Sequence, residues 1–251
     1  MKRFILSTLL FLLLTSIWSF ELIELTDAPT AGILQKGEVR MYSKLYRENG
    51  LNLGTQVGLF PRFMFGVSYG GEQIVGNQEP NYHKRVEFNA KFRLFDESSK
   101  MVAIVLGFDS QGHGRYYNTE DRYDIKSKGF YLTASRNFSL LGAFGIHGGL
   151  NYSLEDSAGD NDLSYFLGFD KSIANMIVFT AEYDFAINDN EEKFDIPLTI
   201  EGEGKGYLNA GINIKFTDSI SLKISARDLL ENSPNTLGMD RSITFNYTTK
   251  F

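Results

Sequence analysis

Histidine is the side chain that most often moves protons or activates nucleophiles in enzymes, and this 251-residue sequence holds three, His83, His113 and His147. Some phospholipases place a serine two residues after the histidine, where the two side chains act as nucleophile and base. In this sequence the positions two residues later hold Arg85, Arg115 and Gly149. The phospholipase pattern is therefore absent.

Carboxylates near His113 offer a second possible chemistry. Asp109, Asp121 and Asp124 could meet His113 in one loop cluster and form the acid–base site of an outer-membrane protease. Polar residues are common in loops that have no catalytic role, and an ordinary loop is a far more frequent origin of such a group than a protease site. We favour the ordinary loop and predict a non-enzymatic protein with no catalytic residue.

Metal and cofactor chemistry has little support in the sequence. Cysteine is absent, which excludes disulfides, thiolate metal ligands and lipid attachment through a cysteine. An acidic stretch with Glu155, Asp156, Asp160 and Asp162 could attract Ca²⁺, but its spacing does not match an EF-hand. We therefore expect no metal site and no cofactor.

The composition excludes one class of partner and favours one class of fold. The formal net charge is −6, and phosphate backbones bind to basic faces, so nucleic acid is not an expected partner. The chain contains 21 Phe, 13 Tyr and 24 Gly but only 5 Pro. Such a composition favours strands over helices.

The first residues have the features of a signal peptide. Lys2 and Arg3 precede an apolar run over residues 4–14, and cleavage after Ser16 or Ser19 is possible. We expect a signal peptide over residues 1–19, the alternative being an uncleaved anchor. After residue 20 no apolar run reaches the length of a transmembrane helix, so a membrane could be crossed only by strands.

Alternation of apolar and polar residues is clearest over residues 85–94. Side chains of a strand point to opposite faces in turn. One face carries Val86, Phe88, Ala90, Phe92 and Leu94, and the other carries Arg85, Glu87, Asn89, Lys91 and Arg93. This strand is expected to separate an apolar environment from a polar one.

Similar segments recur along the chain, and most have about the ten residues that a tilted strand needs to cross a bilayer. They span residues 38–48, 51–60, 62–71, 84–95, 100–109, 126–138, 142–154, 162–171, 175–187, 205–216, 219–228 and 241–251. The connections between them alternate between short and long, apart from a tight first turn at Asn49-Gly50.

Sorted connections are typical of an up-and-down barrel, in which short periplasmic turns lie at one rim and long extracellular loops at the other. We therefore predict an all-β fold, a transmembrane antiparallel up-and-down β-barrel of about 12 strands over residues 38–251, located in the outer membrane of a Gram-negative cell. Residues 20–37 precede it and are expected either in the periplasm or in the lumen.

Charged positions on the inward face of the predicted strands should line the lumen. The candidates are Arg85, Glu87, Lys91, Arg93, His147, Asp170, Glu182, Asp184, Lys215, Lys223 and Arg227. Buried charges must be paired or hydrated. Two interpretations remain open: a lumen closed by ion pairs, or a narrow water-filled pore.

The last strand carries a further signal. Tyr247 and Phe251 alternate with polar residues, and the sequence ends on Phe251. An aromatic C-terminal residue on a final strand is similar to the signal by which outer-membrane barrels are recognised. We therefore predict that Tyr247 and Phe251 engage the barrel-assembly machinery.

Three stretches resemble YjbH-type proteins. They are Asp27-Ala28-Pro29-Thr30-Ala31-Gly32-Ile33-Leu34 with Gly37, the run from Leu59 through Pro61 to Gly71, and Leu106-Gly107-Phe108-Asp109-Ser110. This resemblance implies a role in exopolysaccharide biogenesis or export, with outer-membrane lipids, lipopolysaccharide and polysaccharide-export proteins as partners. The alternative is a narrow passive channel for small anionic or neutral solutes. A third possibility is an outer-membrane hydrolase.

Overall fold

The computed structural model describes residues 21–155, 162–174, 176–189, 205–233, 236 and 238–251. The expected signal peptide at residues 1–19 lies outside the described residues. Among the described residues no helix is long and apolar enough to cross a membrane.

Twelve antiparallel strands form one closed barrel, which confirms the predicted fold class. In barrel order they are β1 (Glu38–Tyr46), β2 (Gly50–Phe60), β3 (Phe63–Glu72), β5 (Glu87–Phe95), β6 (Ala103–Asp109), β9 (Gly129–Ser139), β10 (Ala143–Tyr152), β11 (Ser164–Ile173), β12 (Ile177–Asp184), β13 (Tyr207–Lys215), β14 (Ile220–Arg227) and β15 (Asp240–Lys250). The barrel closes where β1 pairs with β15, from Glu38 opposite Lys250 to Leu45 opposite Ile243. Closure removes the unpaired edges that an open sheet would expose.

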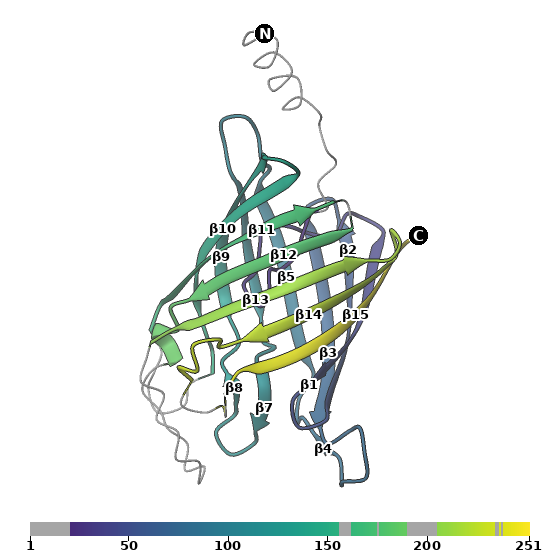
Figure 1. Ribbon diagram of the computed structural model, residues 1–251, viewed down its shortest axis with the longest axis vertical. Coiled ribbons are helices and arrows are strands. Elements are labelled where there is room, and N and C mark those ends of the chain that lie inside the picture. The colour runs from purple at the N-terminus through teal and green to yellow at the C-terminus, as the bar shows by residue number, and fades with distance from the viewer. Residues whose placement is uncertain (1–20, 156–161, 175, 190–204, 234–235, 237) are drawn as a thin grey trace, which may run out of the picture.

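The two rims of the barrel differ, as the loop lengths predict. The C-terminus lies at one end of the barrel, and the elements of the long connections lie at the other (Figure 1). At the terminal rim the turns are short, such as Pro61-Arg62 between β2 and β3. We call this the short-turn rim and its opposite the long-loop rim.

The pleat of each strand sorts its side chains between the lumen and the outside. On β5, Phe88 is 46% exposed and Phe92 47%, while Glu87 is 1% exposed and Lys91 5%. Apolar side chains therefore point away from the barrel, and charged ones point into it. A soluble protein would bury the apolar face, so the arrangement fits a barrel surrounded by lipid.

The long connection between β6 and β9 contains a feature that the sequence analysis missed. It forms a two-stranded hairpin, β7 (His113–Tyr117) paired with β8 (Arg122–Ile125), which belongs to a separate sheet. All four residues of β8 are buried. A two-residue strand, β4 (Asn81–Tyr82), pairs antiparallel with the end of β3, and a short 3-10 helix, η1 (Ile187–Asp189), follows β12.

Residues 21–34 lie inside the barrel, and we call them the plug. Leu25 and Ala28 pack with Phe166 of β11 and Val178 of β12. On the opposite wall the apolar plug residues meet a second cluster, whose members are Ile23, Ala31, Ile33, Leu34, Met64, Ala103, Val105 and Tyr131. The apolar residues of the plug and the apolar residues of the wall together form the hydrophobic core inside the barrel.

Candidate functional site: the plugged lumen

The plug enters the lumen as a tight hairpin-like turn. Leu25 N–H donates to the Ala28 carbonyl at 2.9 Å, and Thr30 N–H donates to the Ile23 carbonyl at 3.1 Å. The turn leaves three successive N–H groups, of Thr26, Asp27 and Ala28, without backbone partners. Buried backbone donors need acceptors, and a carboxylate on the barrel wall supplies them.

That carboxylate belongs to Glu182 on β12. It accepts from Thr26 N at 2.9 Å, Asp27 N at 2.8 Å and Ala28 N at 2.9 Å. Asn209 of β13 donates to the same carboxylate at 2.9 Å. The tip of the plug is therefore held through its backbone by a single side chain.

Basic side chains of β5 hold the other branch of the plug through its carbonyl groups. Lys91 Nζ donates to Thr30 O at 3.1 Å and Gly32 O at 3.3 Å, and also to Ile23 O. Arg93 donates to Ala31 O at 2.7 Å. Lys91 is 5% exposed, so its charge depends on these carbonyl dipoles for solvation.

The carboxylates of the plug pair with cations of the wall. Glu24 lies 3.3 Å from Arg40 of β1 and 3.1 Å from Lys223 of β14. Glu21 pairs with Arg93. Burial alone would raise the pKa of Glu24, but Lys223 and Arg40 hold it well below its usual value.

The innermost carboxylate, Asp27, joins the plug to β14 and to the hairpin. Arg227 Nε lies 2.7 Å from both carboxylate oxygens of Asp27. His113 of β7 lies 3.3 Å from Asp27 through Nε2, and its Nδ1 lies 2.9 Å from Lys44 Nζ. Because the Lys44 ammonium can only donate, Nδ1 is the acceptor and Nε2–H faces Asp27. Burial opposes ionisation, yet Arg227 and the other cations around Asp27 hold its pKa below the usual value.

His147 forms a Ser–His–Asp arrangement on the wall. Its Nδ1 lies 2.7 Å from Ser135 Oγ of β9, and its Nε2 lies 2.7 Å from Asp170 of β11. These are the three groups of a nucleophilic relay. Ser135 Oγ, however, also accepts from Ala31 N of the plug at 2.8 Å. In the observed state the relay anchors the plug.

A small polar cavity of about 60 Å³ remains between the plug, the hairpin and the wall. Its lining includes Glu24, Asp27, Arg40, Lys44, Lys223 and Arg227. The side-chain oxygens of Asn52 and Asn89, which also line it, are buried and have no hydrogen-bond partner in the protein. The cavity has room for a few water molecules, which could satisfy them.

Docking of the hairpin closes the lumen toward the long-loop rim. Tyr123 donates to Glu87 of β5 at 3.1 Å, and Arg122 lies 2.6 Å from Asp189. Glu155, which follows β10, accepts from Tyr123 N at 3.0 Å and Ser127 N at 3.1 Å. Burial raises the pKa of Glu155 to about 7, although these hydrogen bonds and Arg122 oppose the shift.

The predicted lumen residues divide into two groups. Most are buried on the wall, and they are Glu87, Lys91, His147, Asp170, Glu182, Asp184, Lys223 and Arg227. Asp184 pairs with Lys128, and the half-buried Arg93 lies against the plug. Arg85 differs: it lies before β5, its side chain is 41% exposed, and it reaches back to Glu87 at 2.7 Å. Lys215 is half-buried at the end of β13, next to the short-turn rim.

Several lumen residues were missed. Arg40 and Lys44 lie on the inward face of β1, and the alternation in residues 38–48 could have identified them. Glu24 and Asp27 carry no periodic signal, because the plug has neither strand nor helix regularity. Their partners are distant in sequence and could not be inferred from spacing.

The protease-like grouping does not form as a whole, although Asp109 and His113 line the same small cavity. His113 binds Lys44 and Asp27, whereas Asp124 accepts from Arg115 N and Tyr117 Oη, and Asp121 accepts from Tyr116. Within the described residues no group of three or more His, Asp or Glu side chains is arranged to hold a metal ion. Asp156 and Asp160 of the acidic stretch lie outside the described residues.

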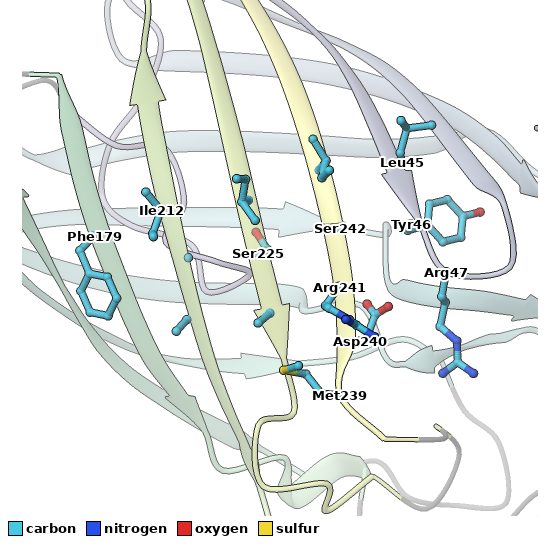
Figure 2. Close-up of a pocket in the computed structure, with 15 residues that line it drawn as sticks. Leu45, Tyr46, Arg47, Phe179, Ile212, Ser225, Met239, Asp240, Arg241 and Ser242 are labelled. Atoms are coloured by element: carbon cyan, nitrogen blue, oxygen red, sulfur yellow. The ribbon is translucent and has the colours of Figure 1, made fainter.

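The outer surface carries a groove of about 710 Å³ across β12, β13, β14, β15 and β1. Figure 2 shows Phe179, Ile212, Arg241 and Leu45 on neighbouring strands around it. Ala210 and Ala226 stand opposite each other in adjacent strands, and their small side chains leave the depression. Most of its lining side chains are apolar and belong to the outer face, but Asp240 and Ser242, which also line it, bind Arg227 of the lumen wall.

No known family profile matches the chain, and no curated protein matches its sequence. Among solved structures, the fold is similar to the KdgM porin, at 8% identity over 84% of this chain and 98% of that chain, with a TM-score of 0.50. The NanC porin is 8% identical over 85% of this chain and 99% of that chain, with a TM-score of 0.45. The outer membrane phospholipase dimer of Salmonella typhi is 10% identical over 86% and 90%, with a TM-score of 0.41. At such identities the similarity concerns the fold alone, which is that of an outer-membrane β-barrel.

Proposed function

We propose that this chain is a non-enzymatic outer-membrane barrel, closed at rest by its own N-terminal segment, that assists exopolysaccharide assembly or export at the cell surface. The observation that carries the closed state is the set of contacts made by the plug. Glu182, Lys91 and Arg227 together bind its backbone donors, its backbone acceptors and its innermost carboxylate. A lumen filled in this way does not itself conduct a polymer.

Location in the outer membrane is supported by the shape and the surface of the barrel. Its outward face is apolar, and its connections are sorted by length between the two rims. The aromatic C-terminus, where Phe251 is 84% exposed, is available to the assembly machinery. The outward face and the long-loop rim are the surfaces that would meet membrane lipids and lipopolysaccharide.

The polysaccharide role rests on the three stretches that resemble YjbH-type proteins. Residues 27–34 belong to the plug and 59–71 form the β2–β3 turn and most of β3, whereas 106–110 include the end of β6, which β5 separates from β3. Met64 of β3 packs with Ala31, Ile33 and Leu34 of the plug. The resemblance is thus concentrated on the plug and part of the wall that receives it.

The test of this role is genetic. Deletion of the gene should reduce surface polysaccharide, and the intact chain should restore it. A chain with Arg227→Gln, which leaves the plug carboxylate Asp27 with weaker support, should restore it only in part. Normal polysaccharide in the deletion strain would refute the role.

A second candidate is a narrow gated channel, and the polar character of the plug contacts favours it. When the plug moves, incoming water can hydrate the polar groups that held it, whereas a fully apolar wall would not attract water. In planar bilayers, wild-type protein should conduct rarely, and the double variant Glu24→Gln/Asp27→Asn should conduct more often. Equal, negligible conductance from both proteins would exclude the channel.

The hydrolase alternative is tested through Ser135, the hydroxyl that contacts His147 in the part of the chain that the structure describes. We expect no hydrolysis of short-chain esters or phospholipids above background, and no difference between wild type and Ser135→Ala. Hydrolysis lost in Ser135→Ala would overturn the non-enzymatic assignment.

A further inference from the structure

The plug has an unusual charge for its position. Residues 21–34 contain three acidic residues, Glu21, Glu24 and Asp27, and no basic residue. Each of the three meets a different set of wall cations: Glu21 meets Arg93, Glu24 meets Arg40 and Lys223, and Asp27 meets Arg227. The wall thus presents a succession of cationic positions to a chain that carries repeated carboxylates.

We propose that this part of the lumen wall is a binding site for an extended polycarboxylate, and that the plug occupies the site with its own three carboxylates. The binding site rests on the proposed function in one respect: the plug that closes the barrel at rest must be able to leave the lumen. The ligand class follows from the contacts, since guanidinium and ammonium groups at several points along a groove recognise carboxylates at several points along a chain.

The energetics favour replacement over simple opening. If the plug left without a substitute, Arg227 and Lys223, now 2% and 4% exposed, would lose the carboxylates of Asp27 and Glu24. A cation whose partner is removed is strongly destabilised unless water or another anion takes its place. Arg227 would keep Asp240 at 3.3 Å, but Lys223 has no second ion pair among the described residues. An incoming carboxylate restores what the plug supplied.

The wall also contains two lysines, Lys44 and Lys91, that form no ion pair with a plug carboxylate among the described contacts. Lys44 lines the 60 Å³ cavity beside Glu24 and Asp27, and its described polar contact is His113 at 2.9 Å. Lys91 is solvated only by plug carbonyls in the described residues. Both ammonium groups become available to a ligand once the plug has moved.

Displacement can be measured on the full chain, because the sequence has no cysteine. A single cysteine at position 28 (Ala28→Cys) reports plug departure, since Ala28 is 1% exposed in the closed state. The reagent is a neutral, water-soluble polyethylene-glycol maleimide, applied at pH 7. The probe ligand is hexaglutamate, and its matched control is hexaglutamine at an ionic strength equalised with NaCl.

Hexaglutamate should accelerate labelling at position 28 at least fivefold over hexaglutamine. The acceleration should fall below twofold when Lys223→Gln and Arg40→Gln are added, although the basal rate will rise. Lys171→Gln, the same type of change in a lysine that binds turn carbonyls at the short-turn rim, should keep the full acceleration. If the double variant fails to assemble, each single variant should lower the acceleration at least twofold.

Equal labelling with hexaglutamate and hexaglutamine would overturn the proposal, as would an acceleration that survives loss of the wall cations. The outcome is separable from that of the bilayer experiment. If a plug variant conducts but hexaglutamate does not accelerate labelling, the channel hypothesis is supported and the binding site is refuted. Hexaglutamate-dependent labelling without conductance in any variant refutes the channel and supports the binding site.

Discussion

Arg227 on β14 holds Asp27 of the plug with its Nε 2.7 Å from both carboxylate oxygens, although 200 positions separate the two residues in sequence. Both side chains are nearly inaccessible, at 2% and 3% exposure. Arg227 also binds Asp240 at 3.3 Å and Ser242 at 2.8 Å on β15. The innermost acid of the plug is therefore built into the hydrogen-bond network of the barrel wall.

Removing that arginine should loosen the plug. Arg227→Gln leaves two buried carboxylates without their cation, a change that costs about 3–5 kcal/mol for buried pairs. We expect faster labelling of a cysteine at position 28 and a lower unfolding temperature. The control is Arg62→Gln, which breaks a pair with Asp96 that is 53% exposed on both sides and should change little. Equal behaviour of the two variants would contradict the assigned role of Arg227.

The facing of β5 predicts opposite results from neighbouring positions. A charge at a lipid-facing site near the bilayer centre costs about 2–4 kcal/mol, so Phe88→Arg should impair insertion, whereas Lys91→Gln should insert normally and only loosen the plug. Cysteine labelling distinguishes this from a loss of core packing. A cysteine at 88 should react with a lipid-phase probe, and one at 91 should not. If the cysteine at position 88 reacted with a water-soluble probe and not with the lipid-phase probe, the membrane barrel would be excluded.

The C-terminal residue should matter for assembly more than its neighbour does. Phe251 is 84% exposed and Lys250 is also exposed at the rim, so neither contributes to a core. Deletion of Phe251, or Phe251→Asp, should lower the amount of folded, heat-modifiable barrel severalfold, and Lys250→Gln should not. Similar yields from both changes would argue against an assembly signal at Phe251, and Tyr247→Ser would then be the remaining test.

Closure at the long-loop rim should depend on pH through Glu155, whose pKa is raised to about 7. A carboxyl with a raised pKa favours the folded state while protonated, so its contribution is present below about 4.5 and declines as the pH rises through 7. The hairpin should therefore exchange amide hydrogens faster at pH 8 than at pH 5, after correction for intrinsic rates. Arg122 and Arg85 lie near this carboxylate and remain charged throughout. Glu155→Gln should remove most of the difference, and an unchanged pH dependence in that variant would assign it to another group.

The sequence alone determined the wall of the barrel. Alternation over segments such as 84–95 was sufficient because successive side chains of a strand point to opposite faces. The alternation of apolar and polar residues in the sequence therefore shows directly which side chains face the lipid and which face the lumen. The same logic placed Glu87, Lys91, Glu182 and Arg227 in the lumen, where they are found. The order of short and long connections then fixed an antiparallel barrel in which β1 begins and β15 ends at the same rim.

What fills the barrel was decided only by the tertiary structure. The plug and the β7–β8 hairpin have no repeating pattern, because their residues meet different walls on different sides. Glu24 lies beside Lys223 and Asp27 beside Arg227 only after the chain has closed on itself through β1 and β15. Sequence spacing describes neighbours along an element, whereas these pairs arise from closure, and so the choice between an open and a closed lumen could not be read from the chain.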